Sequence, residues 1–140
     1  MKGNITLTMI KPTAMEKGYA GKIITRVLEA GFKLKAMKML QLTKSQAMEF
    51  YGIHTGKPFY DDLVKYMSSG PIIAAILEKE NAVEEYRKLI GSTNPEKAEK
   101  GTIRYDYGTN IQANAVHGSD SDENAIIESN FFFSQLERLK

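Results

Sequence analysis

The chain has 140 residues and no cysteine, which predicts one compact domain over residues 1–140 and excludes disulfides and thiolate chemistry. Its net charge of +2 is too small to indicate nucleic-acid binding by itself, so we expect no specific nucleic acid partner. The N-terminus lacks the apolar core of a signal peptide, and no apolar run approaches the roughly 20 residues that cross a bilayer. We therefore expect a cytoplasmic protein without a membrane partner.

The N-terminal part of the sequence predicts a strand, a helix and a second strand. Residues 5–10 are apolar and β-branched, which is typical of a buried strand. In residues 20–30 the apolar side chains recur at helical spacing, and Gly31 ends that helix. Residues 32–42 then alternate as a strand does, with a possible irregularity near Met37, where the phase changes.

The middle of the sequence predicts helices around one central strand. Thr43 and Gln46 form a capping-box pattern, so a helix should begin there and run to about Tyr51, and a short helix follows at residues 60–67. The apolar run at residues 71–77 is too short for a typical helix and indicates a buried central strand. Asn81 is expected to cap the next helix.

The C-terminal part predicts a long loop, a short strand and a last helix. Residues 91–112 are polar and glycine-rich, and loops of that length in a compact domain are usually functional. A strand is expected at residues 113–116, and residues 119–122 should cap a helix that runs to about Leu139. Without the extra helices this order is βαββαβ, an α+β ferredoxin-like fold with a four-stranded antiparallel sheet and helices on its faces.

His117 is the candidate nucleophile because it is expected at the end of a strand, followed by Gly118 and a polar helix start. The glycine clears space for a bulky group, and the helix N-terminus favours an anion nearby. A neutral imidazole with an open nitrogen attacks phosphorus well near pH 7. The alternative is an ordinary histidine beside a helix cap.

Three cations and a hydroxyl could hold a polyphosphate near this histidine. Lys11 follows the first strand, Arg87 and Arg104 flank the long loop, and Thr93 lies within it. Fixed cations of this kind spread the negative charge of a phosphoryl transition state. Taken singly, each cation is more typical of a solvated surface.

Glu128 is expected two turns into the last helix, where its carboxylate could reach back to His117. It would select one imidazole tautomer and leave the other nitrogen free, as the acid of a Ser-His-Asp triad does. Alone, it would be an acid on a helix surface.

Other motifs are absent or weak. The sequence has no GxxxxGK[ST] loop, which excludes a P-loop kinase. Gly18 and Gly21 match the GXXG of a KH domain, but this pattern is short and leads into a single helix. Two histidines without ligand spacing argue against a zinc site, so no metal is expected to be held by the protein directly.

The segment Asn114–Ser121 reads NAVHGSDS and resembles the N-x-x-H-G-S-D-S signature of the nucleoside diphosphate kinase family. Several further segments resemble motifs of that family in the same order along essentially the whole chain. They are Ile10-Lys11-Pro12, Gly18 and Gly21, Lys57-Pro58-Phe59-Tyr60, Leu63 to Pro71, Gly91 to Pro95, and Gly101 to Arg104.

This resemblance implies a kinase that moves the γ-phosphate of a nucleoside triphosphate to a nucleoside diphosphate. The implied mechanism is ping-pong through phosphohistidine at the pros nitrogen of His117, with low base specificity. The contacts to phosphate and ribose would come from Lys11, Tyr51, Arg87, Thr93, Arg104 and Asn114. Phe59 would stack on the base, Ile111 would close its other face, Glu128 would orient His117, and Ser119 would support it. Mg²⁺ would bridge phosphate oxygens.

The resemblance also implies a homo-oligomer, a tetramer or a hexamer, although the sequence lacks the longer C-terminal extension of some members. Thr13 replaces the usual Asp and Lys57 replaces Arg, outside the phosphate contacts. Two alternatives stay open: a non-catalytic nucleotide- or RNA-binding ferredoxin-like module, and a paralogue that keeps the fold without the reaction. The complete set of polar site residues argues against the second.

Overall fold

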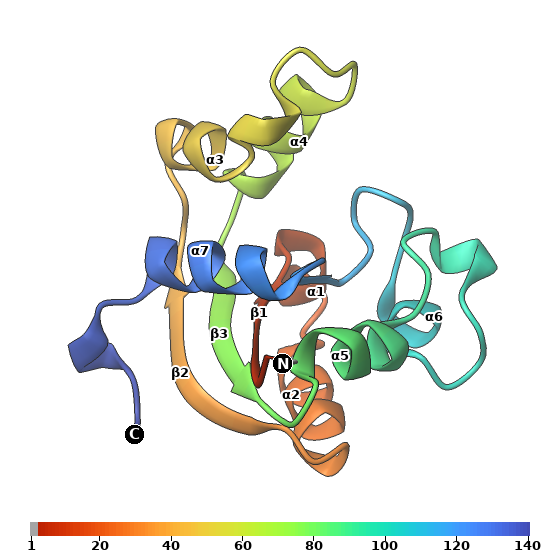
Figure 1. The fold of residues 1–140 in the computed structure, drawn as a ribbon. Coiled ribbons are helices and arrows are strands. Elements are labelled where there is room, and N and C mark those ends of the chain that lie inside the picture. Colours follow the sequence, from red (N-terminus) through yellow and green to blue (C-terminus); the bar gives the residue numbers. More distant parts are fainter. Residues whose placement is uncertain (1–2) are drawn as a thin grey trace.

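A four-stranded antiparallel sheet organises the molecule, and the computed structural model describes residues 3–140 (Figure 1). The strands are β1 (Ile5–Ile10), β2 (Lys33–Leu40), β3 (Ile72–Glu78) and β4 (Val116–Gly118). Their order in the sheet is β2-β3-β1-β4, and each neighbouring pair is antiparallel. The ferredoxin-like pattern that was predicted from the sequence is confirmed.

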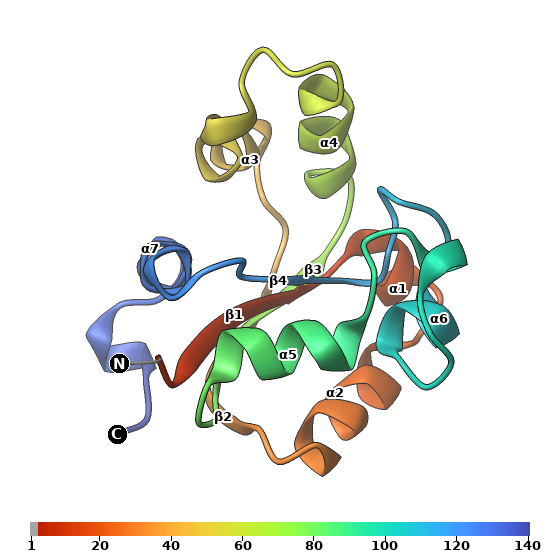
Figure 2. The ribbon, with the colours of Figure 1, turned by 45° about the vertical axis from the view of Figure 1, so that its right-hand side comes forward.

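Helices cover both faces of this sheet. Figure 2 shows α2 and α5 on one side of the strands and α3, α4 and α7 on the other. In chain order they are α1 (Pro12–Glu16), α2 (Ala20–Glu29), α3 (Lys44–Phe50), α4 (Tyr60–Met67), α5 (Ala82–Ile90), α6 (Ile103–Tyr107) and α7 (Asp122–Phe132), with 3-10 turns η1 (Gly52–His54), η2 (Pro95–Lys97) and η3 (Gln135–Glu137). No helix among residues 3–140 is long and apolar enough to cross a membrane.

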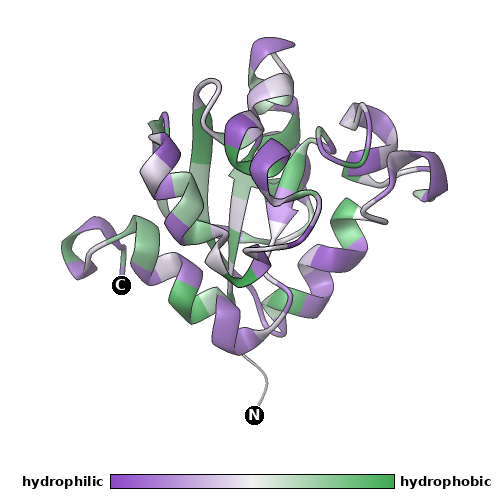
Figure 3. Ribbon diagram, turned by 90° about the horizontal axis from the view of Figure 1, so that it is seen from above, coloured by the Kyte–Doolittle hydropathy of each residue, from purple (hydrophilic) through white to green (hydrophobic). Residues whose placement is uncertain are grey.

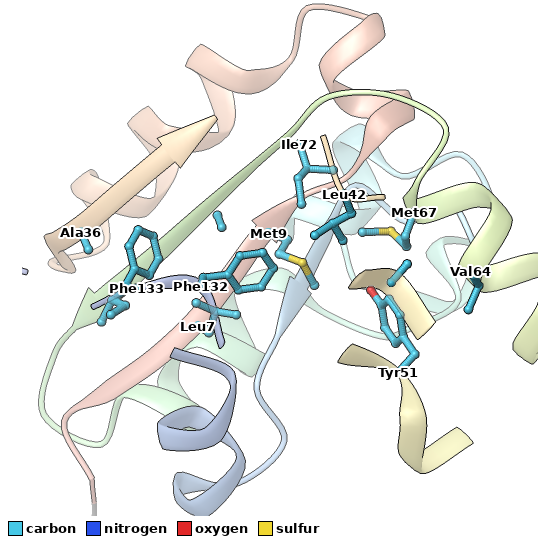
Figure 4. Close-up of a cluster of buried hydrophobic side chains, with 13 residues drawn as sticks. Leu7, Met9, Ala36, Leu42, Tyr51, Val64, Met67, Ile72, Phe132 and Phe133 are labelled. Atoms are coloured by element: carbon cyan, nitrogen blue, oxygen red, sulfur yellow. The ribbon is translucent and has the colours of Figure 1, made fainter. Parts of the chain in front are cut away.

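The sheet divides the core into two layers because successive residues of a strand point to opposite faces. In β3, Ala74 and Ile76 join the cluster beneath α3, α4 and α7, whereas Ala75 and Leu77 face α2 and α5. Burial on both faces explains why β3 is a continuous apolar run. Figure 4 shows the first cluster, and in Figure 3 the surrounding helices carry both apolar and polar residues.

Several expected elements have the expected boundaries. β1 and α4 begin and end at the predicted residues. The capping box at the start of α3 is present: the backbone N–H of Gln46 donates to the Thr43 hydroxyl at 3.1 Å, and the Thr43 N–H donates to the Gln46 side chain at 2.9 Å. These signals are local, so the sequence suffices to predict them.

Other details differ from the expectation. A short helix, α1, follows directly after Lys11, because Pro12 at its first position has the φ that a helix needs. The irregularity expected near Met37 is present in β2, and it lies between Leu34 and Ala36. Asn81 does precede α5, but its φ is 56° and its amide donates to Glu84 at 2.9 Å, so its side chain caps no backbone N–H. The long loop contains η2 and α6.

Two predicted boundaries near the C-terminus are wrong. β4 begins at Val116 instead of residue 113, because Ala115 has a φ of 75° and the Val116 N–H donates to the Asn114 carbonyl in a tight three-residue turn. His117 is therefore inside the strand and not after it. α7 ends at Phe132 and does not reach Leu139, because Phe133 is extended and packs into the core.

Candidate active site

An open cavity of about 1110 Å³ lies beside the end of β4, and it collects most of the predicted site residues. Its volume lies just above the roughly 300–1,000 Å³ of most small-molecule and cofactor sites. The predicted residues that line it are Lys11, Phe59, Arg87, Thr93, Arg104, Ile111, Asn114 and His117. Their segments are distant in sequence, so the fold brings them together.

The sheet aims His117 and Lys11 at the same side. His117 is paired with Met9 across the antiparallel β4–β1 ladder, so the two side chains share a face. Lys11 follows Met9 by two residues in extended backbone, and its N–H donates to the Ala115 carbonyl at 2.9 Å. The pairing of β4 with β1 and the pleat of the sheet thus place both side chains in the cavity.

A carboxylate holds His117 from behind. The Nε2 atom of His117 lies 2.8 Å from Oε1 of Glu128, as expected from the predicted return of α7. The Ser119 hydroxyl donates to the same oxygen at 2.7 Å and accepts the Leu7 N–H at 3.1 Å. A carboxylate accepts hydrogen bonds, so the proton of the neutral imidazole is on Nε2 and the lone pair is on Nδ1.

Phe50 is a neighbour of His117 that the sequence did not reveal. Its ring centroid is 5.7 Å from that of His117, with the planes at 77°, and the edge-to-face geometry limits rotation of the imidazole. Phe50 also contacts the rings of Phe131 and Phe132 on α7, the helix that carries Glu128. No sequence motif identifies it, since a phenylalanine at a helix end is typical of a core contact.

The two innermost cations raise the positive potential of the cavity. Burial, and then the charge of Arg104, lower the pKa of Lys11 to about 7. Burial also lowers the pKa of Arg104 to about 10. Tyr86 acts to raise this pKa and the charge of Arg87 acts to lower it. Among residues 3–140 neither cation has a carboxylate partner, and two desolvated cations of this kind stabilise an anion placed between them.

Buried polar atoms around the cavity also lack partners. Among the described residues, nothing accepts from Nε of Arg104 or donates to Oδ1 of Asn114, although both atoms are buried. Arg104 is otherwise anchored, donating to the carbonyls of Gly91 and Val116 at 3.0 and 2.9 Å. The amide of Asn114 donates to the Thr93 carbonyl at 3.0 Å. Unsatisfied buried groups are unfavourable, and a polyphosphate or sugar would satisfy them.

Two apolar side chains at the cavity remain half exposed. Phe59, between η1 and α4, is 47% exposed, and Ile111 in the loop after α6 is 58% exposed. They offer flat apolar surface without a hydrogen-bonding edge. The ring of His54 lies 5.3 Å from that of Phe59, which makes His54 a second neighbour of the site that sequence reasoning did not identify.

Tyr51 is the predicted contact residue that does not line the cavity. It belongs to the buried cluster shown in Figure 4. Its hydroxyl is buried without a partner among the described residues, and burial raises its pKa. Glu128 and Ser119 are also outside the lining, because they stand behind His117.

Residues 3–140 contain no group of three or more histidine, aspartate or glutamate side chains that could hold a metal ion. The cavity instead presents several cations, two amides and three hydroxyls, with Glu99 as its one acidic lining residue. The cations, amides and hydroxyls suit phosphate oxygens, which could themselves carry a divalent cation.

Comparisons with known proteins show which family the chain is similar to. A family model described as nucleoside diphosphate kinase matches residues 4–138. The chain is 56% identical to nucleoside diphosphate kinase of Flavobacterium psychrophilum over 99% of each sequence. It is similar to the solved structure of the Aquifex aeolicus enzyme, with a TM-score of 0.95, 47% identity, and 97% and 99% of the two chains covered. The Halobacterium salinarum enzyme, solved in complex with CDP, has a TM-score of 0.94 at 35% identity, covering 99% of this chain and 93% of that one.

Proposed function

The chain belongs to the nucleoside diphosphate kinase family, an enzyme family of nucleotide phosphotransferases, and from this premise we propose that its reaction runs through phosphorylated His117. The enzyme transfers the terminal phosphate of a nucleoside triphosphate to a nucleoside diphosphate. The non-catalytic binding module that the sequence left open receives no support from the comparisons.

The observation that carries the proposal is the contact of His117 with Glu128 at 2.8 Å. Because Nε2 carries the proton, the lone pair of Nδ1 attacks the γ-phosphorus. The bond between that phosphorus and its bridging oxygen breaks, and the nucleoside diphosphate leaves with the electron pair. Glu128 stabilises the cationic ring that forms. A second diphosphate then attacks the phosphohistidine and reverses the step.

The cations act on the transferring group. Lys11 and Arg104 are buried beside His117, where fixed positive charge stabilises a phosphoryl transition state without reorganisation. Arg87, Thr93 and Asn114 line the same cavity and would hold the remaining phosphates and the ribose. We also propose a phosphate contact for Tyr51, because its buried hydroxyl has no partner among residues 3–140 and the charge of Glu128 is among the causes that raise its pKa.

One site binds both the nucleotide that donates the phosphate and the nucleotide that accepts it. The base must therefore be held through a feature that all bases share. Phe59 and Ile111 offer apolar surface to its faces, and every base has such a face. We therefore expect low base specificity.

Kinases of this family generally use a divalent cation, and we propose that it is Mg²⁺ bound to the nucleotide. When bound, it would neutralise negative charge on the phosphates. Lys11, Arg87, Thr93 and Arg104 would hold the phosphates that carry it.

We further propose a homo-oligomer, tetrameric or hexameric, in which a second copy covers the β2 edge. β2 has a single neighbour in the sheet, and its Met37 and Met39 are 49% and 69% exposed. Met37 also lines an apolar groove with Ile24 of α2. Exposed apolar strand edges are covered in stable assemblies.

Incubation with γ-labelled ATP and Mg²⁺ tests the proposed reaction. We expect an acid-labile, alkali-stable label on the protein, which ADP, GDP, CDP and UDP each remove at rates within roughly two decades of one another. His117→Ala should carry no label. Exchange at the wild-type rate in His117→Ala would refute the proposed nucleophile, and use of a single base would refute the apolar base site.

A further inference from the structure

One side chain outside the cavity fastens the helix that carries Arg104. Arg26 lies in the last turn of α2, and its Nη1 donates to Oδ2 of Asp106 at 2.8 Å. Its Nη2 donates to the Gly101 carbonyl at 2.7 Å. The guanidinium also lies over the Tyr107 ring, 5.6 Å from its centroid. α2 is thereby joined to the 91–112 loop by three contacts from one residue.

These contacts lie at both ends of α6. Gly101 lies just before this five-residue helix, and Asp106 and Tyr107 form its last turn. The guanidinium is a rigid planar fork, so its two hydrogen bonds fix the distance and the angle between the two ends. Burial of Ile103 keeps α6 against the core, but apolar packing is non-directional and does not set the helix's rotation as the fork does.

The rotation of α6 decides where Arg104 points. Arg104 is the second residue of this helix, and its guanidinium reaches the Val116 carbonyl, one residue before His117. Its Nε atom is buried without a partner among the described residues, and the side chain lines the cavity. A small shift of a five-residue helix would therefore move this charge relative to the phosphate that His117 attacks.

We propose that Arg26 is a positioning residue for phosphoryl transfer: from outside the cavity it holds α6 in the orientation that keeps Arg104 beside His117. The inference rests on the proposed function of Arg104 and His117. The three residues that the Arg26 guanidinium contacts, Gly101, Asp106 and Tyr107, lie outside the cavity lining, so its effect must pass through α6.

Single-turnover phosphorylation by ATP measures the effect. We expect Arg26→Met to lower the rate constant of phosphohistidine formation by roughly tenfold or more, since small misplacements of catalytic groups have effects of this size. Arg26→Lys keeps the charge and can still donate hydrogen bonds but lacks the planar fork, so it should recover only part of the rate. The apparent dissociation constant for ATP should change less than the rate constant, because the charge acts mainly on the transition state.

Lys38→Met is the matched control. Lys38 also combines an ion pair, to Glu137 at 3.0 Å, with a ring contact, to Phe133 at 4.9 Å, but it lies on β2 far from α6 in the chain and outside the cavity lining. We expect the wild-type rate in this variant. The midpoint of thermal unfolding should shift by less than about 5 °C in both methionine variants, since exposed ion pairs stabilise little.

The Arg104→Met background shows whether Arg26 acts through Arg104. Adding Arg26→Met to it should produce no further loss, because the group to be positioned is gone. An equal loss in both backgrounds, or a wild-type rate in Arg26→Met, would overturn the inference.

Hydrogen exchange separates this inference from the proposed function. The amides of Asp106 and Gly108 donate within α6, to the carbonyls of Thr102 and Arg104, and should exchange faster in Arg26→Met than in Lys38→Met. If the wild-type protein formed no phosphohistidine, the proposed function would fail while this readout still reported on α6. Unchanged exchange would contradict the positioning role.

Discussion

At the scale of single residues, one oxygen of Glu128 accepts from both His117 and Ser119. Glu128→Gln keeps the shape and removes the charge, so we expect phosphohistidine formation to slow by roughly one to three decades. Rapid-mixing measurement with labelled ATP gives this rate. Glu123→Gln removes the same charge from an exposed position on α7 and should leave the rate unchanged. Equal rates in both variants would show that Glu128 does not act on His117.

The buried charge of Lys11 lowers the stability of the folded protein, although the proposed reaction needs it. Its pKa is about 7 in the folded protein and about 10.5 in an unfolded chain, so between these values the unfolded chain binds the additional proton. Wild-type stability should therefore rise with pH from 7 to about 10, and the cost of a buried charge is complete below pH 7. Lys11→Met should be more stable than the wild type at pH 6, and the difference should shrink by pH 9.

Urea unfolding at both pH values checks this, with Lys65→Met, at an exposed position, as the control that should show no such trend. Lys11→Met should also lose most of its rate of phosphorylation. A wild-type kcat with only a raised KM would mean that Lys11 binds the ground state and does not act in the transition state.

At the scale of elements, Gly118 is required by the packing of β4 on α5. Its φ is not positive, so no left-handed turn requires a glycine there; the positive φ belongs to Ala115. A Cβ atom at position 118 would lie 2.9 Å from Cδ2 of Tyr86, whose ring is buried and whose hydroxyl is 2.6 Å from that of Thr8. The space that the glycine clears is therefore occupied by Tyr86 and not by a phosphate.

Gly118→Ala should lower the free energy of unfolding by about 1–3 kcal/mol, because the Tyr86 ring cannot move away without losing its partner. Gly21→Ala, with open space around its Cβ position in α2, should be neutral or stabilising by up to about 1 kcal/mol. Chemical denaturation of both variants gives the comparison. A neutral Gly118→Ala would show that α5 can retreat from the strand.

At the scale of the whole molecule, the exposed edge of β2 determines the expected assembly. A second copy would bury any charge placed on this apolar face, which is unfavourable. The double variant Met37→Lys, Met39→Lys should therefore dissociate the oligomer. Met48→Lys, at a residue of similar exposure on α3, should leave it intact. Light scattering after size exclusion measures the mass. An unchanged mass in the double variant would place the interface elsewhere.

The C-terminal residues shape the same edge. The Leu139 N–H donates to the Lys35 carbonyl at 2.8 Å, at the irregularity of β2. Lys38 pairs with Glu137 further along the strand. The segment after α7 therefore covers part of the edge, while Met37 and Met39 stay exposed.

Local signals in the sequence determined the order of the strands and of the longer helices, the bounds of β1 and α4, the capping box of α3 and the motif around His117. These rest on side-chain periodicity and on hydrogen bonds between near neighbours in the chain. The approach of Glu128 to His117 was also predictable, because a strand that leads into a returning helix brings such residues together.

Only the tertiary structure decided the remaining features, because each depends on segments that are distant in sequence. Packing of Phe133 ends α7, and the turn at Ala115 sets the start of β4. The low pKa of Lys11 requires burial and Arg104, from another element. The hold of Arg26 on α6 joins residues 80 positions apart, and no local propensity encodes a contact of that range.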